Sequence, residues 1–176
     1  MGYFKNEEKT REDFYEEDGI RWFRTGDIGQ VETDGVIRII DRKKDLVKLQ
    51  HGEYISYGKI EAILKTSPMV ENICTYADPN QNFPVAVVIP STSELATISA
   101  LPASEAIKQR EVEQAVVSQL EKYGLRLGLE KVETPKRVHM TLDEWTPDSG
   151  LVTAAFKIRR KFIVERYQKE IEALYL

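Results

Sequence analysis

The pattern of apolar and polar positions changes near residue 41. Residues 6–15 are mostly charged and begin with Asn6, so they predict a short polar helix with Asn6 as its N-cap. Three short strand patterns follow. Asp18-Gly19 before the first and Asp34-Gly35 between the last two favour tight turns. The strand patterns cover residues 21–24, 28–32 and 36–40. An antiparallel ribbon of this size buries too little surface to be stable alone, so we interpret residues 1–41 as the end of a larger domain.

After residue 41, helical and extended patterns alternate. Apolar residues at helical spacing predict three helices, with Ser56 capping the first and Gly124 ending the second. The combination predicts an α+β fold, with helices packed on a small three-stranded sheet and the β-ribbon before it. The predicted helices are residues 56–67, 104–123 and 157–174, and the predicted strands are residues 70–77, 83–89 and 136–142.

Composition narrows the functional classes. A net charge of −4 gives little electrostatic support for binding nucleic acid. No apolar run approaches the roughly 18 residues that span a bilayer. The single Cys74 excludes an internal disulfide and fits a reducing compartment, and its strand pattern predicts a buried side chain rather than a nucleophile. One Cys and two His make a structural zinc site a poor explanation.

The first candidate site is the turn motif Arg-Thr-Gly-Asp that ends at Asp27. Glycine between a hydroxyl and a carboxylate makes a tight turn that exposes both side chains. A carboxylate in this position can accept two hydrogen bonds from a ribose diol. Taken alone, the motif is more often an ordinary β-turn with a local bond to the Asp side chain.

The second candidate is a charged segment, residues 41–48, followed by a loop over residues 50–56. Permanent charges at a domain break suit a polar hinge beside a phosphate ligand. Gly52 allows the backbone to turn sharply or to approach a ligand closely. Taken alone, a solvated linker followed by a turn explains the same residues.

The third candidate is Lys157, within the segment 145–161 and at the start of a predicted helix. A lysine at a loop-to-helix junction can extend as a point charge toward an anion. The alternative is a surface lysine that begins a basic helix. Because a positive charge opposes the helix dipole at an N-terminus, this position needs an explanation.

In this order, the three segments closely resemble the adenylate-forming enzyme superfamily. The run from Asp18 to Lys44 resembles its fatty-acyl-CoA synthetase signature. Residues 2–10 and 145–161 resemble the eukaryotic long-chain branch, and the resemblance covers nearly the whole chain. Arg24 and Val31 depart from the general signature, which has an aromatic residue or His and a tryptophan there, but neither departure removes a reacting group.

The resemblance implies a reaction in two steps. A fatty acid carboxylate attacks the α-phosphate of ATP to give acyl-AMP, and the thiol of coenzyme A then displaces AMP to give the thioester. By resemblance, Asp27 and Arg42 bind the nucleotide and Lys157 is catalytic in the first step. Asp41 is the implied hinge about which the small domain rotates between the steps. The implied loop for coenzyme A and thioester formation contains Gly52, Glu53 and Tyr54.

The resemblance also implies a domain organisation. Residues 1–41 would be the tail of the large N-terminal domain, and residues 42–176 the mobile C-terminal domain. The phosphate loop, the adenine pocket, the acyl tunnel and the Mg²⁺ ligands would lie in the missing N-terminal domain. The 176 residues alone are therefore expected to be inactive.

The implied ligands are ATP, Mg²⁺, coenzyme A and a fatty acid, with no nucleic acid. The intact enzyme would be intracellular, on a cytosol-facing membrane of the endoplasmic reticulum, mitochondrion or peroxisome, through parts outside this chain. Two alternatives stay open: another acyl- or aryl-CoA ligase, which residues 145–161 disfavour, and a non-catalytic interaction module. A Lys-ending phosphate loop upstream would distinguish the enzyme from the module.

Overall fold

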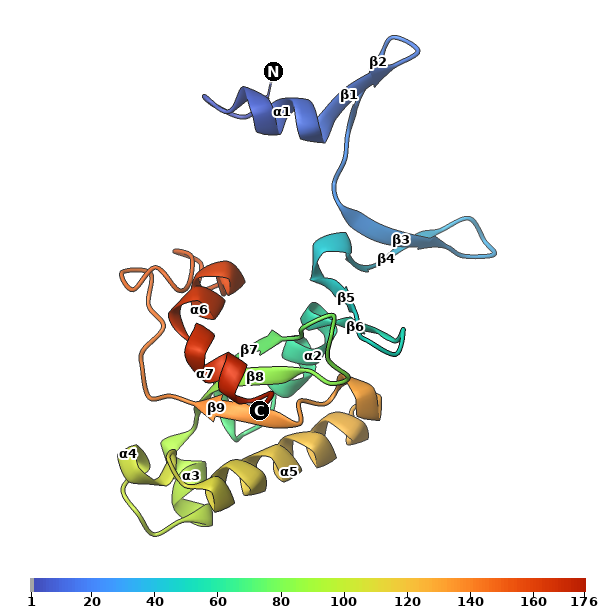
Figure 1. The fold of residues 1–176 in the computed structure, drawn as a ribbon. Coiled ribbons are helices and arrows are strands. Elements are labelled where there is room, and N and C mark those ends of the chain that lie inside the picture. The colour runs from blue at the N-terminus through green and yellow to red at the C-terminus, as the bar shows by residue number, and fades with distance from the viewer. Residues whose placement is uncertain (1) are drawn as a thin grey trace. The chain divides into compact units, whose positions relative to one another are not determined.

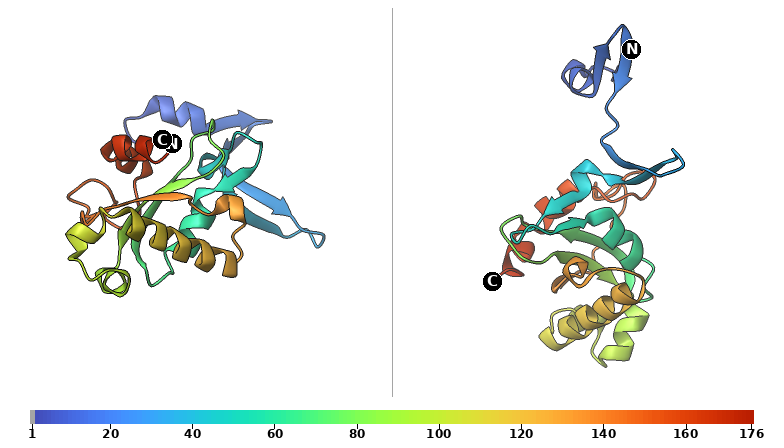
Figure 2. Two further views of the ribbon diagram at one scale, coloured as in Figure 1. Left: turned by 60° about the horizontal axis from the view of Figure 1, so that its bottom comes forward. Right: turned by 90° about the vertical axis from the view of Figure 1, so that its right-hand side faces the viewer.

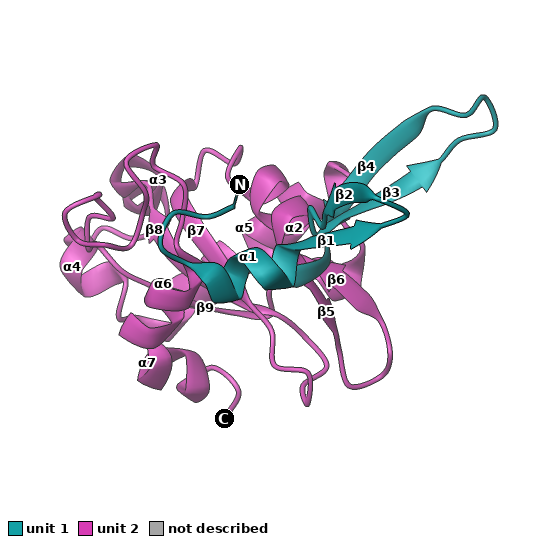
Figure 3. Cartoon of the chain, turned by 90° about the horizontal axis from the view of Figure 1, so that it is seen from above, with its two compact units in different colours: residues 1–44 teal, residues 45–176 magenta. Residues whose placement is uncertain are grey.

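The computed structural model describes residues 2–176, which divide into two compact units between Lys44 and Asp45 (Figure 3). We call them the N-terminal unit and the C-terminal unit. The division falls three residues later than the predicted domain boundary (44 against 41). The cause is local: the Lys43 N–H donates to Gly26 O at 2.8 Å, which ties this segment to the N-terminal unit.

The N-terminal unit confirms the predicted helix cap, because Asn6 Oδ1 accepts a hydrogen bond from Lys9 N at 3.0 Å. It does not form one continuous ribbon, since its strands make two separate hairpins. The predicted helix also ends early: Phe14 pairs with Phe23 across a hairpin, and their ring centroids lie 4.9 Å apart. The elements are α1 (Glu7–Asp13), β1 (Phe14–Glu17), β2 (Ile20–Phe23), β3 (Asp27–Val31) and β4 (Ile37–Arg42).

The C-terminal unit begins with a short hairpin and continues as alternating strands and helices (Figure 1). A 3₁₀ turn, η1 (Lys43–Asp45), spans the boundary between the units, and a second, η2 (Lys131–Glu133), precedes the last strand. The strands are β5 (Leu46–Lys48), β6 (Tyr54–Ser56), β7 (Val70–Tyr76), β8 (Val85–Pro90) and β9 (Arg137–Met140). The helices are α2 (Tyr57–Leu64), α3 (Thr92–Ile98), α4 (Ala103–Ala106), α5 (Arg110–Arg126), α6 (Arg160–Arg166) and α7 (Gln168–Ala173).

The predicted three-stranded sheet is confirmed, with strand order β7-β8-β9. β7 and β8 are antiparallel, whereas β8 and β9 are parallel. Alternate residues of β8 face opposite sides: Ala86 and Val88 pack with α2 and α5, while Val85 and Val87 pack with α6 and α7. Figure 2 shows the sheet between these helices. Because both faces are covered, the strand reads as a continuous apolar run.

The predicted middle helix differs from the structure at both ends. Residues 104–123 are divided between α4 and α5, and α5 continues through Gly124 to Arg126. Gly124 serves packing rather than termination, because a Cβ there would lie 2.7 Å from Leu129 Cδ1. Gly128, at φ +93°, provides the left-handed residue after the helix. The pattern also missed α3.

The predicted last helix is also divided. α6 and α7 are separated at Tyr167, whose φ of −111° and ψ of 26° interrupt the helix. Lys157 lies outside the helix, which begins at Arg160. Ile163 is buried, whereas Phe162, which the pattern placed on the apolar side, is exposed. The buried stripe nevertheless continues across the interruption, since Ile163, Tyr167 and Ile171 all lie in the same apolar cluster.

Ser56 caps α2, as predicted: its Oγ accepts a hydrogen bond from Lys59 N at 3.0 Å. Replacing Ser56 with Ala should lower the free energy of unfolding by about 1 kcal/mol, because the first turn loses this bond. The matched control is Ser91→Ala, since Ser91 precedes α3 without a side-chain capping bond. Urea unfolding followed by circular dichroism measures both variants, and equal losses would contradict the capping role.

Candidate functional site

In the N-terminal unit, the two predicted nucleotide-binding residues face each other across a hairpin. Asp27 begins β3 and Arg42 ends β4, and they are direct partners in the strand register. Arg42 Nε lies 3.4 Å from Asp27 Oδ1. Gly26, at φ +74°, makes the turn before β3, and Thr25 Oγ1 accepts a hydrogen bond from Asp27 N at 3.1 Å. The turn and the register therefore hold a carboxylate and a guanidinium side by side.

Asp41, the predicted hinge, is a residue of β4. It pairs with Ile28, next to an irregularity in the register of β3 and β4. Its Oδ1 accepts a hydrogen bond from the N–H of Arg42 at 2.7 Å. Asp41 thus lies inside the N-terminal unit, three residues before that unit ends at Lys44 (44 against 41).

The predicted coenzyme A loop is the turn of the β5–β6 hairpin. Gly52 has φ +99°, a conformation that residues with a side chain adopt only with strain. Its N–H donates to Leu49 O at 2.9 Å. Leu49 is 2% exposed and fixes one end of the turn in the core. Glu53 is exposed, and Tyr54 lies in β6 with 64% of its surface exposed. The turn therefore combines a buried support with an exposed tip.

Lys157 lies in a narrow turn before α6. Val152 and Ile158 form an isolated antiparallel bridge, and Thr153 N donates to Lys157 O at 2.8 Å. Thr153 Oγ1 in turn accepts a hydrogen bond from Lys157 N at 3.2 Å. Phe156 takes a left-handed conformation at φ +56°. The backbone of Lys157 is thus held by Thr153 on both sides while the residue itself is exposed.

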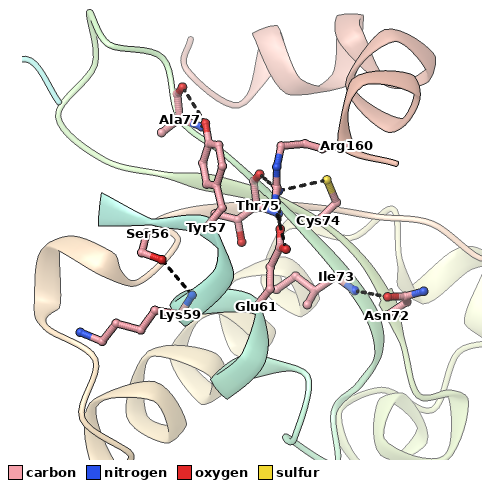
Figure 4. A network of polar contacts seen from close by, with 10 residues as sticks. All are labelled: Ser56, Tyr57, Lys59, Glu61, Asn72, Ile73, Cys74, Thr75, Ala77 and Arg160. Carbon is pink, nitrogen blue, oxygen red and sulfur yellow. Dashed lines mark hydrogen bonds and ion pairs between the residues drawn. The ribbon is translucent and has the colours of Figure 1, made fainter. Parts of the chain in front are cut away.

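Next to this turn, Arg160 enters a part-buried polar cluster (Figure 4). Its two terminal nitrogens both donate to the carboxylate of Glu61, one of them, Nη2, at 3.0 Å to Oε2. Nη1 also donates to Thr75 O at 2.7 Å, and Glu61 Oε1 accepts from Thr75 N at 2.7 Å. The Tyr57 ring centroid lies 4.2 Å from the guanidinium carbon. The cluster joins α2, β7 and α6.

The surroundings in this cluster raise the pKa of two side chains. Burial alone would lower the pKa of Arg160, but its hydrogen bonds and its attraction to Glu61 outweigh burial and raise that pKa. Burial raises the pKa of the Cys74 thiol to about 12, and the nearby Arg160 charge offsets only part of the effect. The guanidinium therefore stays charged, and the thiol stays protonated.

The sequence motifs located the exposed candidate residues but missed the inward-pointing residues that fix the backbone beside them. Asp27 and Arg42 are brought together, whereas the segments around Gly52 and Lys157 lie on different sides of the C-terminal unit (Figures 1 and 2). Glu61 and Arg160 are 99 positions apart, and no local pattern links them. The one available signal was the basic run of residues 159–161, which does not tell which member turns inward.

Within residues 2–176, no group of three or more His, Cys, Asp and Glu side chains could hold a metal ion. None of the helices in the same range is both long and apolar enough to cross a membrane.

No family model matches the chain, but individual proteins do. Long chain acyl-CoA synthetase 8 of Arabidopsis thaliana is 45% identical over 99% of this chain and 25% of its own length. Long-chain-fatty-acid–CoA ligase 1 of Schizosaccharomyces pombe is 38% identical over 99% of this chain and 26% of its own length. The chain therefore spans about a quarter of these relatives.

Among solved structures, the A domain of carboxylic acid reductase from Segniliparus rugosus superposes with a TM-score of 0.84 at 30% identity. The match covers 99% of this chain and 26% of that one, which was solved with AMP and a carboxylic acid. The fold is thus that of the adenylate-forming enzymes. Within this class, the homologues of the chain are long-chain acyl-CoA synthetases, as the resemblance predicted.

The burial of Cys74 predicts how fast its thiol reacts. At pH 8, a thiol with a pKa of about 12 is almost wholly protonated, so the single cysteine should react very slowly with a disulfide reagent in the folded chain. In urea, its pKa returns to its usual range and the reaction should become fast and stoichiometric. Absorbance of the released thiolate measures both rates, with Cys74→Ser as the blank. Fast labelling without denaturant would show that the thiol is accessible.

Proposed function

We propose that this chain is the C-terminal quarter of a long-chain fatty acid–CoA ligase that forms acyl-AMP from ATP and then the CoA thioester. The observation that carries the proposal is 45% identity over 99% of the chain to a long-chain acyl-CoA synthetase. The paired Asp27 and Arg42 and the supported Lys157 turn add chemical support, because each suits a nucleotide or its phosphates. An interaction module would need neither arrangement.

In the adenylation step, the fatty acid carboxylate oxygen bonds to the α-phosphorus of ATP, and pyrophosphate leaves with the electrons of the broken P–O bond. We assign Asp27 to the ribose hydroxyls, which can donate to its carboxylate oxygens. Arg42 supports the same ribose or its phosphate. Lys157 places a positive charge beside the oxygens where negative charge accumulates, which lowers the free energy of the transition state.

In the thioester step, the thiol sulfur of coenzyme A bonds to the acyl carbon and loses its proton. The bond from that carbon to the phosphate oxygen breaks, and AMP leaves with its electrons. We assign the loop of Gly52, Glu53 and Tyr54 to this step, with Gly52 leaving room for the pantetheine arm. The Gly52 loop and the Lys157 turn lie on different sides of the C-terminal unit, so a rotation of that unit between the steps would present each in turn. Residues 1–41 then belong to the large domain and residues 42–176 to the mobile one.

Mg²⁺ is the expected companion of ATP. By the resemblance to the adenylate-forming family, we assign its ligands to the large domain outside this chain. We also assign any attachment of the intact enzyme to a cytosol-facing membrane to parts outside this chain.

The direct test is to purify the intact enzyme and measure acyl-CoA, AMP and pyrophosphate from ATP, coenzyme A and acids of several classes. We expect long-chain fatty acids to be used in preference to medium-chain and aryl acids. The 176-residue chain serves as the blank and should form no product. Preference for aryl acids would favour another ligase of the superfamily.

Lys157→Ala in the intact enzyme should reduce pyrophosphate release at least about 10²-fold, because the adenylation transition state loses a principal positive charge. Thioester formation from supplied acyl-AMP should be nearly unchanged. The control is Lys161→Ala, since Lys161 is an exposed lysine in the first turn of α6. Equal damage to the two half-reactions by Lys157→Ala would reject its assigned role.

Asp41→Pro should block the thioester step while acyl-AMP still forms, if the restrained backbone holds the adenylation state. Proline fixes φ near −65° and also restricts Ile40. The comparison variant is Lys44→Pro, at the end of the N-terminal unit. Both half-reactions and the melting temperature are measured on one preparation of each. A block by Lys44→Pro alone would move the pivot from Asp41 to the boundary between the units.

A further inference from the structure

The first turn of α6 is fixed by a side chain that points inward. Arg160 is 21% exposed at its side chain, although Lys161 beside it is 80% exposed. The inward guanidinium binds Glu61 of α2 through two nitrogens and the carbonyl of Thr75 in β7. A bidentate pair fixes the orientation of the planar guanidinium as well as its distance, which a purely apolar contact would not do.

A short series of backbone bonds connects this anchor to Lys157. The Arg159 N–H donates to Leu151 O at 2.8 Å, and Ile158 forms the bridge to Val152. The next bond, from Thr153 N, reaches Lys157 O. Lys157 is therefore held between the anchored start of α6 on one side and the Leu151–Thr153 segment on the other.

The side chain of Lys157 has no comparable restraint of its own. Over residues 2–176, no hydrogen bond or ion pair joins Lys157 Nζ to another side chain. The point from which this long side chain extends is then set by its backbone alone. Small displacements of a catalytic charge strongly reduce its effect on the rate. The contacts that fix the Lys157 backbone, which begin at Arg160, would therefore affect the rate of the reaction.

We propose that Arg160, through its two-nitrogen pair with Glu61, is a positioning residue for Lys157 in the adenylation step. The proposal rests on the proposed role of Lys157 and adds the residues that set its location. Arg160 itself would touch no substrate. It fixes the start of α6 and the preceding turn, so that the Lys157 ammonium group reaches the phosphate oxygens.

The competing explanation is that Arg160 only stabilises the fold. A loss of stability reduces the fraction of folded enzyme and lowers both half-reactions together. It also acts independently of Lys157, so the two losses multiply. A positioning residue lowers adenylation alone, and its effect disappears once the group it positions has been removed.

The experiment is a double-mutant cycle in the intact enzyme, measured well below the melting temperature. Arg160→Lys keeps the charge but loses the bidentate geometry, and should slow pyrophosphate release about tenfold or more. Thioester formation from supplied acyl-AMP should change by less than about twofold, because a misplaced Lys157 does not act in that step. In a Lys157→Ala background, Arg160→Lys should add less than about threefold.

Arg137→Lys is the matched control. Arg137 also forms a two-nitrogen pair in the C-terminal unit, with Glu113 of α5, through bonds of 2.6 and 3.3 Å. It lies on β9, outside the series of contacts that leads to Lys157. Its replacement should affect stability but not the ratio of the two half-reactions.

Each outcome decides the proposal. Multiplying losses in the cycle, or equal losses in both half-reactions, would reduce Arg160 to a stabilising residue while leaving the role of Lys157 intact. Normal adenylation by Lys157→Ala itself would instead reject the proposed function. If Arg160→Lys does not fold, Glu61→Gln provides the second route to the same cycle. If neither variant folds, the pair is a requirement of the fold and the positioning role is rejected.

Discussion

A guanidinium and a carboxylate can be enclosed between helices only when nearly all their donors and acceptors have partners. Arg160 and Glu61 are part-buried and bond to each other and to the backbone of Thr75, so the pair cannot shift without breaking several bonds at once. Removing one partner of a fully buried pair typically costs about 3–5 kcal/mol, and the loss here should be smaller because both side chains keep some exposure. Because the partners come from α2, β7 and α6, this pair ties the start of α6 to the sheet and to α2.

In the C-terminal unit, the residues that fix the backbone differ from the residues to which we assign a chemical role. In each candidate segment of the C-terminal unit, an inward-pointing residue fixes the backbone and an exposed residue carries the proposed role. The pairs are buried Leu49 with Tyr54, and part-buried Arg160 with Lys157. The sheet between them is covered on both faces, which makes it a rigid support for both turns. The proposed rotation between the two half-reactions would need such rigidity, because rotation can exchange the faces of a unit only if each face keeps its shape.

Short-range physics explains what the sequence could predict. Asn6 and Ser56 cap helices because the bonding partner lies three residues ahead, and Asp18-Gly19 makes a turn because both residues accept positive φ. The three strands of the sheet followed from apolar runs of strand length. Ordered motifs identified the adenylate-forming fold and its long-chain relatives.

The sequence by itself thus determined the helix caps, turns, sheet strands and family. Tertiary structure alone decided that α5 runs through Gly124, where Leu129 leaves no room for a side chain, and that Ile163 rather than Phe162 is buried. It also selected Arg160 from a run of basic residues and paired it with Glu61, 99 positions away. The reason is physical: local propensity depends on neighbours in the chain, whereas burial depends on which distant surfaces pack together, and no short pattern records that choice.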